Sequence, residues 1–242
     1  VNEAALLAAR RGRNQIEPRL LSEAVERVVA GPEKRSRILS AEDRARIAYH
    51  ECGHAVVSTA LPGTDRVSKL SIVARGHAGG FTWMVPEGDQ VVITRSQLLD
   101  RIAALLGGRA AERVVFGEVS SGAQADLEHA VQLGRRMIAD FGMSQHLGPY
   151  IVKPLTHGYA GDYGVGYSER IASEIDAEVQ SILKKAEERA THAIVSNRDA
   201  FERLARTLIE AETLEDDALD QLLLPISESG SIEPAAVTSR SN

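Results

Sequence analysis

The chain has a single cysteine, Cys52, among its 242 residues. One cysteine cannot form a disulfide within the chain, which excludes a disulfide-stabilised scaffold and fits a reducing compartment. No apolar run approaches the roughly 18 residues that a membrane-spanning helix needs, and no signal-peptide pattern is visible. The pattern GxxxxGK[ST] is missing too, so the chain has no Walker A loop to hold ATP. With a net charge of −6, the composition does not indicate a nucleic-acid partner.

What the chain does contain is typical of a soluble globular protein, with 43% hydrophobic and 26% charged residues. Its length allows one large domain or two small ones. It begins at Val1 rather than Met and opens directly into a helix-like segment, so we expect a soluble fragment of a longer protein. The missing membrane and targeting segments are therefore weak evidence about the parent protein.

The most informative segment is residues 50–54, whose sequence HECGH matches the pattern HExxH. On a helix, His50 and His54 are four residues apart, so both imidazoles lie on one face and can reach one metal ion. Glu51 is offset from that face, where its carboxylate can meet a water bound to the metal. Zinc held in this way beside an acidic general base is the chemistry of a metallopeptidase. Two partly exposed histidines on an amphipathic helix are the alternative interpretation.

Residues 41–60 are predicted to form the helix that carries this motif. The segment has no Pro and one Gly, Ser40 is a suitable N-cap, and Glu42 and Asp43 lie in the first turn. The sequence LPG at 61–63 supplies the stop. The motif therefore lies in the middle of a helix, as its geometry requires.

The remaining periodicity predicts a mainly α-helical fold with a small β-sheet. Strands are expected at 67–73 and 80–85, where β-branched and aromatic residues predominate. Residues 142–167 lack periodicity and are expected to form a mobile loop, and the Ser- and Pro-rich end from 227 is expected to be disordered. Residues 34–39 form a basic linker, and 214–223 a short acidic segment. Further helices are predicted at 2–11, 19–30, 96–116, 126–141, 169–196 and 198–211.

A catalytic zinc ion needs a third protein ligand besides His50 and His54. Asp126 is the best candidate, because it follows a small polar loop and opens a helix, from where its carboxylate can point at a neighbouring helix. An ordinary helix N-cap is the alternative interpretation of Asp126. The other candidates are His77, His129, His146, His157, His192, Glu112, Glu118 and Glu128.

Four segments, in this order, resemble one family: residues 48–55 (AYHECGHA), 86–89 (PEGD), 107–112 (GGRAAE) and 121–127 (SGAQADL). Together they look like the peptidase domain of the FtsH family, membrane-anchored ATP-dependent zinc proteases of the AAA class. The opening residues 2–6 resemble the last helices of that family's AAA lid. The resemblance implies that His50, His54 and Asp126 hold one zinc ion per subunit and that Glu51 is the catalytic base.

Two positions depart from the family pattern. Cys52 stands where the family more often has Ala, and we expect it to pack in the core rather than take part in redox chemistry. Arg113 stands where a second Glu often follows Glu112. Glu112 is therefore a candidate either for supporting the metal centre from behind or for a salt bridge.

The resemblance also implies the domain organisation. Residues 1–35 would be a remnant of the AAA lid with a linker, 36–225 a zincin-like helical zinc metallopeptidase domain, and 226–242 a disordered tail. An ATPase domain, through which alone ATP would act, and transmembrane segments would lie upstream. The full-length protein would be a homohexamer at the cytoplasmic face of the cell membrane. It would degrade unfolded, damaged or membrane proteins for quality control.

A polypeptide substrate needs an extended groove beside the metal. The strand with Gly80, Phe81, Thr82 and Trp83 is the candidate, because an open strand edge can pair with a substrate backbone. An interior place in the sheet is an equal alternative. The apolar side of the helix at 169–196 offers packing either between subunits or within one.

Two other functions stay open. A closed zinc site with four protein ligands would be structural, with His129 as the candidate fourth ligand, three residues after Asp126. A zinc amidase or deacetylase would use the same chemistry on small substrates. The expected loop and strand edge favour a polymer substrate.

Overall fold

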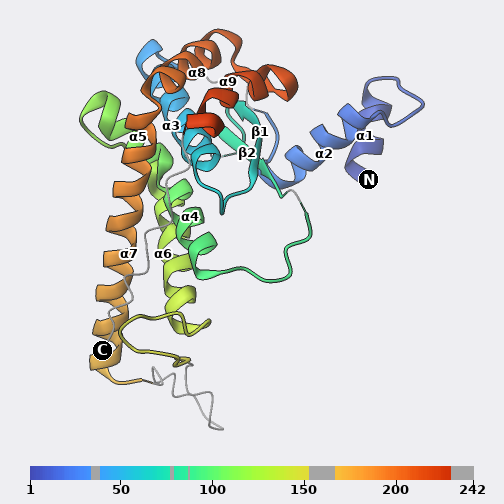
Figure 1. The fold of residues 1–242 in the computed structure, drawn as a ribbon. Coiled ribbons are helices and arrows are strands. Elements are labelled where there is room, and N and C mark those ends of the chain that lie inside the picture. Colours follow the sequence, from blue (N-terminus) through green and yellow to red (C-terminus); the bar gives the residue numbers. More distant parts are fainter. Residues whose placement is uncertain (34–38, 77–78, 87, 153–166, 230–242) are drawn as a thin grey trace.

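The computed structural model describes residues 1–33, 39–76, 79–86, 88–152 and 167–229. Within them the fold is mainly α-helical with one small sheet, as the sequence predicted (Figure 1). The elements are α1 (Asn2–Arg10), α2 (Pro18–Ala30), α3 (Ala41–Ala60), β1 (Arg66–Ser71), β2 (Phe81–Val85), α4 (Arg95–Leu105), α5 (Gly107–Phe116), the 3₁₀ turn η1 (Ser121–Ala123), α6 (Gln124–Ala139), α7 (Glu169–Ser196), α8 (Arg198–Ala211), β3 (Thr213–Glu215) and α9 (Asp216–Ser229).

Helix α3 is the centre of the fold and carries the HExxH motif. Its predicted bounds are confirmed: the Ser40 side chain accepts a hydrogen bond from the Asp43 amide at 3.0 Å and so caps the first turn. From Ala48 onward almost every residue of α3 is buried, because α4, α5, α8, α9 and the sheet all pack around it. Cys52 is fully buried in this core, as expected.

Helices α3 and α5 approach so closely that their contact tolerates only glycine. A Cβ at Gly53 would lie 2.4 Å from the Gly107 carbonyl oxygen, and one at Gly107 would lie 2.7 Å from the Gly53 oxygen. The helix predicted over 96–116 is interrupted, but at Leu106 rather than at 107–108: α4 ends at Leu105, and α5 already begins at Gly107. These glycines bring the backbone of α5 directly against the motif.

The sheet has three antiparallel strands in the order β2-β1-β3. Strand β3 was not predicted, because the sequence showed only a short acidic segment there. It has three residues and forms a strand because it pairs with β1, with Leu214 opposite Leu70. Strand β2 pairs with β1 alone among the described residues, with Thr82 opposite Leu70. In this part of the chain β2 is thus an edge strand rather than an interior one.

Helix α7 braces one side of the molecule, running beside α4, α5 and α6 (Figure 1). Its apolar residues Ile175, Val179 and Ile182 are buried in the same core as α3, which favours packing within the subunit. Glu178 on α7 is buried and accepts hydrogen bonds from the Ser144 hydroxyl and the Gln145 amide, at 2.5 and 2.9 Å. This holds the described part of the predicted loop, 142–152, against α7; residues 153–166 lie outside the described chain.

Helices α1 and α2 form a hairpin at the edge of the molecule with a small core of its own (Figure 1). Two ion pairs join it to the sheet side: the buried Glu26 on α2 contacts the partly buried Lys69 of β1 at 3.0 Å and the buried Arg75 at 2.9 Å. Arg75 in turn lies over the ring of Phe81 on β2, 5.2 Å from its centroid. The predicted domain boundary at 35 and most of the basic linker fall at 34–38, outside the described residues.

The C-terminal end of the folded part corrects one predicted boundary. Helix α9 continues to Ser229 and buries Ile226 fully, so the expected tail does not begin at 226. The apolar spacing of Leu219, Leu223 and Ile226 extends the helix past the point where Ser-rich composition suggested disorder. Residues 230–242 lie outside the described chain. None of the described helices has the length and apolarity to cross a membrane.

Candidate metal centre

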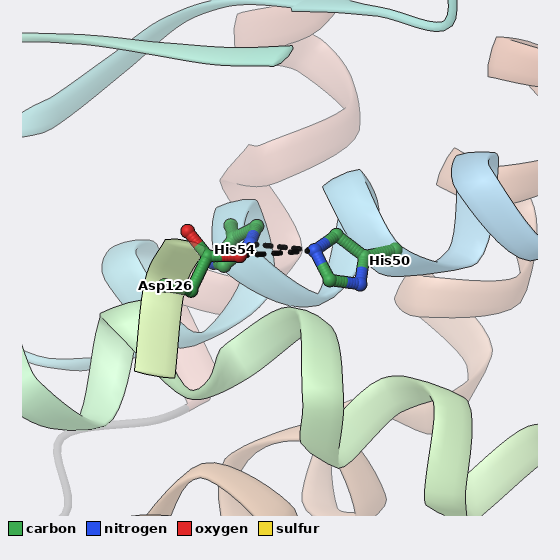
Figure 2. Close-up of side chains that lie close together, drawn as sticks. All are labelled: His50, His54 and Asp126. Atoms are coloured by element: carbon green, nitrogen blue, oxygen red, sulfur yellow. Dashed lines mark hydrogen bonds and ion pairs between the residues drawn. The ribbon is translucent and has the colours of Figure 1, made fainter. Parts of the chain in front are cut away.

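His50, His54 and Asp126 meet at one point between α3 and the start of α6. Figure 2 shows the two imidazoles and the carboxylate directed toward one another. The Nε2 atoms of the two histidines are 3.2 Å apart, and Asp126 Oδ2 lies 3.3 Å from His50 Nε2 and 3.5 Å from His54 Nε2. Three potential ligand atoms thus form a nearly equilateral triangle.

The size of this triangle matches zinc. Bonds of about 2.0–2.1 Å at tetrahedral angles place neighbouring ligand atoms about 3.3 Å apart. The observed separations of 3.2, 3.3 and 3.5 Å need almost no adjustment to hold such an ion. Nitrogen and carboxylate oxygen are also donors that zinc accepts. The residues present therefore fit the metal that the motif predicted.

Hydrogen bonds behind the two rings set which nitrogen faces the triangle. The buried Glu112 carboxylate accepts from His50 Nδ1 at 2.8 Å, and the Ala104 carbonyl accepts from His54 Nδ1 at 2.8 Å. With both Nδ1 atoms acting as donors, both Nε2 atoms keep a lone pair for a metal ion. The tautomer required for binding is thus imposed by α4 and α5.

Glu112 supports His50 from behind rather than pairing with an arginine. Only 1% of its side chain is exposed, and its oxygens also accept from the Ser120 amide and hydroxyl at 2.5 and 3.0 Å. Burial by itself raises the pKa of Glu112, but the bonds from His50 and Ser120 outweigh this effect and lower it. The carboxylate therefore stays ionised beside the imidazole.

The centre attracts positive charge. Burial by itself lowers the pKa of His50, but its hydrogen bonds with Asp126 and Glu112 dominate and raise the pKa to about 10. Burial likewise raises the pKa of Asp126, and the bonds with His50 and His54 overcome this and lower it well below its usual range. Carboxylates that stabilise an imidazolium here will stabilise a bound cation in the same place.

Glu51 lies in the same cleft, offset from the triangle as the motif geometry predicted. It is 6% exposed, and burial raises its pKa, an effect that the neighbouring His54 and His50 oppose. Thr82 Oγ1 donates to Glu51 Oε2 at 2.7 Å. A buried carboxylate with a raised pKa has the basicity that a general base near neutral pH requires.

A cleft of about 1190 Å³ runs past the centre. Of the predicted substrate residues, Gly80, Phe81 and Thr82 line it, while Trp83 does not and Met84 does. Thr82 and Met84 contact Glu51 and Ser58, both on α3, and the intervening Trp83 side chain alternates to the other face of β2. Phe81, the first residue of β2, lines the cleft although it has the same parity as Trp83.

None of the other described candidates joins the triangle as a ligand: Glu112 lies behind His50 and Glu128 lines the cleft, while His77 and His157 lie outside the described residues. Among the described residues, His50, His54 and Asp126 form the only group of three or more His, Cys, Asp or Glu side chains close enough to hold one metal ion. His129 is exposed on α6 outside this group. The described chain therefore offers three ligands rather than the four of a closed structural site. Sequence reasoning missed the Ala104 carbonyl, which no side-chain pattern can reveal, and Ser120, whose place in a polar loop eight residues after Glu112 was the available signal.

Comparison with known proteins identifies the family. The model of peptidase family M41 matches residues 37–222. The chain is 44% identical over 226 residues to ATP-dependent zinc metalloprotease FtsH 1 of Thermoanaerobacter sp. (strain X514), covering 92% of this chain and 37% of that protein. It is also 44% identical to the FtsH proteins of Bacillus subtilis, over 231 residues, and Thermotoga maritima, over 234, covering 92% of this chain in each case and 36% and 37% of theirs. The chain thus spans little more than a third of these relatives. It belongs to peptidase family M41, as the resemblance to FtsH proteases predicted.

Proposed function

We propose that the chain is a zinc-dependent endopeptidase in which His50, His54 and Asp126 hold the metal and Glu51 is the general base. The observation that carries this proposal is the triangle of ligand atoms at 3.2, 3.3 and 3.5 Å, with the Glu51 carboxylate in the same cleft. Membership of peptidase family M41 and the zinc metalloprotease names of the relatives agree with it.

Different residues of the chain have different roles in the proposed peptide hydrolysis. Zinc, when bound, supplies a Lewis acid that polarises a peptide carbonyl and lowers the pKa of water toward 7. Glu51 takes a proton from the attacking water and passes it to the leaving amine. Glu112 and the Ala104 carbonyl keep the two imidazoles turned toward the metal.

The substrate is a polypeptide rather than a small amide. Residues of the edge strand β2 line the cleft, so an extended chain can pair with that strand through its backbone. Because pairing through the backbone depends little on the side chains of the substrate, we expect a loose sequence preference for cleavage. An amidase or deacetylase specific for small molecules needs no such edge, and comparing a peptide series with small acylated amines separates the two.

The wider setting rests on the relatives, which are named ATP-dependent. Since the chain covers about a third of each, we propose that ATP acts through a separate ATPase domain of the full-length protein. We further propose a homohexamer at the cytoplasmic face of the membrane that degrades unfolded, damaged or membrane proteins.

Zinc analysis beside a cleavage assay tests the proposal. Glu51→Gln should keep its zinc and lose casein cleavage, whereas His54→Ala and Asp126→Ala should lose both. His129→Ala is the matched control, because this histidine is exposed on α6 outside the cluster and should change neither. Undiminished cleavage by Glu51→Gln, or full zinc in Asp126→Ala, would reject the assigned roles.

A further inference from the structure

Thr82 was expected to contact substrate, but its hydroxyl is directed at the base. Thr82 Oγ1 lies 2.7 Å from Glu51 Oε2 and 3.2 Å from the Glu51 main-chain oxygen. A hydroxyl donates one proton, and the shorter bond goes to the charged acceptor, which forms the stronger hydrogen bond. The principal contact of the Thr82 side chain is therefore the carboxylate.

The surroundings of Glu51 leave its carboxylate few other restraints. In the part of the chain that the structure describes, Thr82 provides the one side-chain hydrogen bond to Glu51. On the other oxygen, a Cβ at Gly80 would come within 2.9 Å of Oε1, and within 2.7 Å of the Ser71 carbonyl. Gly80, directly before β2, thus leaves room for Oε1, and Thr82 on β2 holds Oε2.

We infer that Thr82 is a positioning residue for the general base, and this inference rests on the proposed function. Its hydroxyl holds Oε2 as an acceptor, so Oε1 is the oxygen left to take the proton from the attacking water. Thr82 keeps its own proton throughout and does not contact the reacting atoms. It acts only by selecting the Glu51 rotamer in which Oε1, rather than Oε2, is left without this side-chain hydrogen bond.

This role links substrate binding to the chemistry. Thr82 belongs to the edge strand along which we propose that the substrate backbone pairs, and its side chain reaches across to α3. One element then sets both where the peptide lies and how the base is oriented. A merely structural threonine would instead satisfy the main-chain oxygen of α3 and leave the carboxylate alone.

The test compares Thr82→Val, which keeps the shape and removes the hydroxyl, with Thr82→Ser, which keeps the hydroxyl. Both are measured in the full-length protein with a short fluorogenic peptide, whose cleavage does not depend on unfolding. For Thr82→Val we expect kcat to fall about 10- to 100-fold, the usual range for losing a hydrogen bond to a charged group. KM should change less than about twofold, because a transition-state interaction is lost rather than substrate binding. Thr82→Ser should recover most of kcat.

Thr59→Val is the matched control. The Thr59 hydroxyl donates to the Ala55 carbonyl on α3, at 2.8 Å, and Thr59 is not among the described residues that line the cleft of the metal centre. It should leave kcat and KM near wild type. Zinc content and melting temperature, measured for every variant, show whether a loss of activity comes from a damaged fold.

Each other outcome overturns the inference. An unchanged kcat in Thr82→Val removes the positioning role, a raised KM with unchanged kcat restores the substrate-contact interpretation, and failure of Thr82→Ser to recover activity assigns the effect to packing. Glu51→Gln separates this inference from the proposed function. If that variant is inactive while Thr82→Val is normal, only the inference fails; if Glu51→Gln cleaves normally, the proposed function fails.

Discussion

Replacing Gly108 by alanine should weaken zinc binding without unfolding the protein. The new Cβ would lie 2.4 Å from His50 Nε2, 2.5 Å from Cε1 and 2.6 Å from Cδ2, which is inside the imidazole ring's own contact surface. Ordinary van der Waals contact begins at 3.4 Å. The ring must therefore move by about 1 Å, whereas zinc–ligand distances tolerate only about 0.2 Å.

The clash in Gly108→Ala can hardly be relieved except by moving the His50 ring. Helix α5 cannot retreat cheaply, because Gly107 is packed against Gly53 and the fully buried Ala110 and Ala111 lie on the same helix. Moving the ring also strains the 2.8 Å hydrogen bond from His50 to Glu112. Disturbing such supporting bonds typically costs 10- to 100-fold in metal affinity, and displacing the ligand itself should cost at least about 10-fold.

The assay is a competition between the protein and a zinc chelator, read beside thermal unfolding. Gly134→Ala on α6 is the matched control, since its Cβ would meet Val179 at an ordinary 3.6 Å. It should keep wild-type zinc affinity and gain a few tenths to about 1 kcal/mol from helix propensity. Wild-type zinc affinity in Gly108→Ala would refute the geometry of the centre.

Three further predictions follow from other contacts. Glu112→Gln should weaken zinc binding about 10- to 100-fold with a small change in melting temperature, since the amide keeps the shape but loses the charge facing His50; unchanged affinity in a chelator titration would contradict this. Burial and the hydrogen bond to Glu202 raise the pKa of Tyr49 to about 12. The protonated Tyr49 therefore stabilises the folded state fully below about pH 10, and this stabilisation is lost as the pH rises toward 12. Tyr49→Phe should remove this pH dependence from the free energy of unfolding measured between about pH 10 and 12. If free zinc is at 100 times the Kd of the site, removing it with a chelator should lower the free energy of unfolding by about 2.7 kcal/mol. For a chain of this size the melting temperature should then fall by roughly 5–10 °C. An unshifted melting curve would argue against a bound metal.

Local sequence was enough to predict the bounds of several helices. The predicted bounds of α3, α7 and α8 agree with the structure to the residue, because caps such as Ser40 and Ser168 and the apolar period lie within each segment. Strand β3 was missed for the opposite reason. Three residues carry no period, and Thr213–Glu215 is a strand only because β1 lies beside it.

The sequence alone determined that two imidazoles and a carboxylate share one helix, because the spacing of His50, Glu51 and His54 is set by the geometry of a single turn. It gave Asp126 as the best of several candidates for the third ligand, since that residue lies 76 positions from His50 and its approach depends on how α6 packs. Which imidazole nitrogens face the proposed metal, and which oxygen of Glu51 is left free, depends on how the elements pack. Those choices are made by the Ala104 carbonyl, Glu112 and Thr82, whose hydrogen bonds to α3 span 31 to 62 positions and exist only once separate elements have packed.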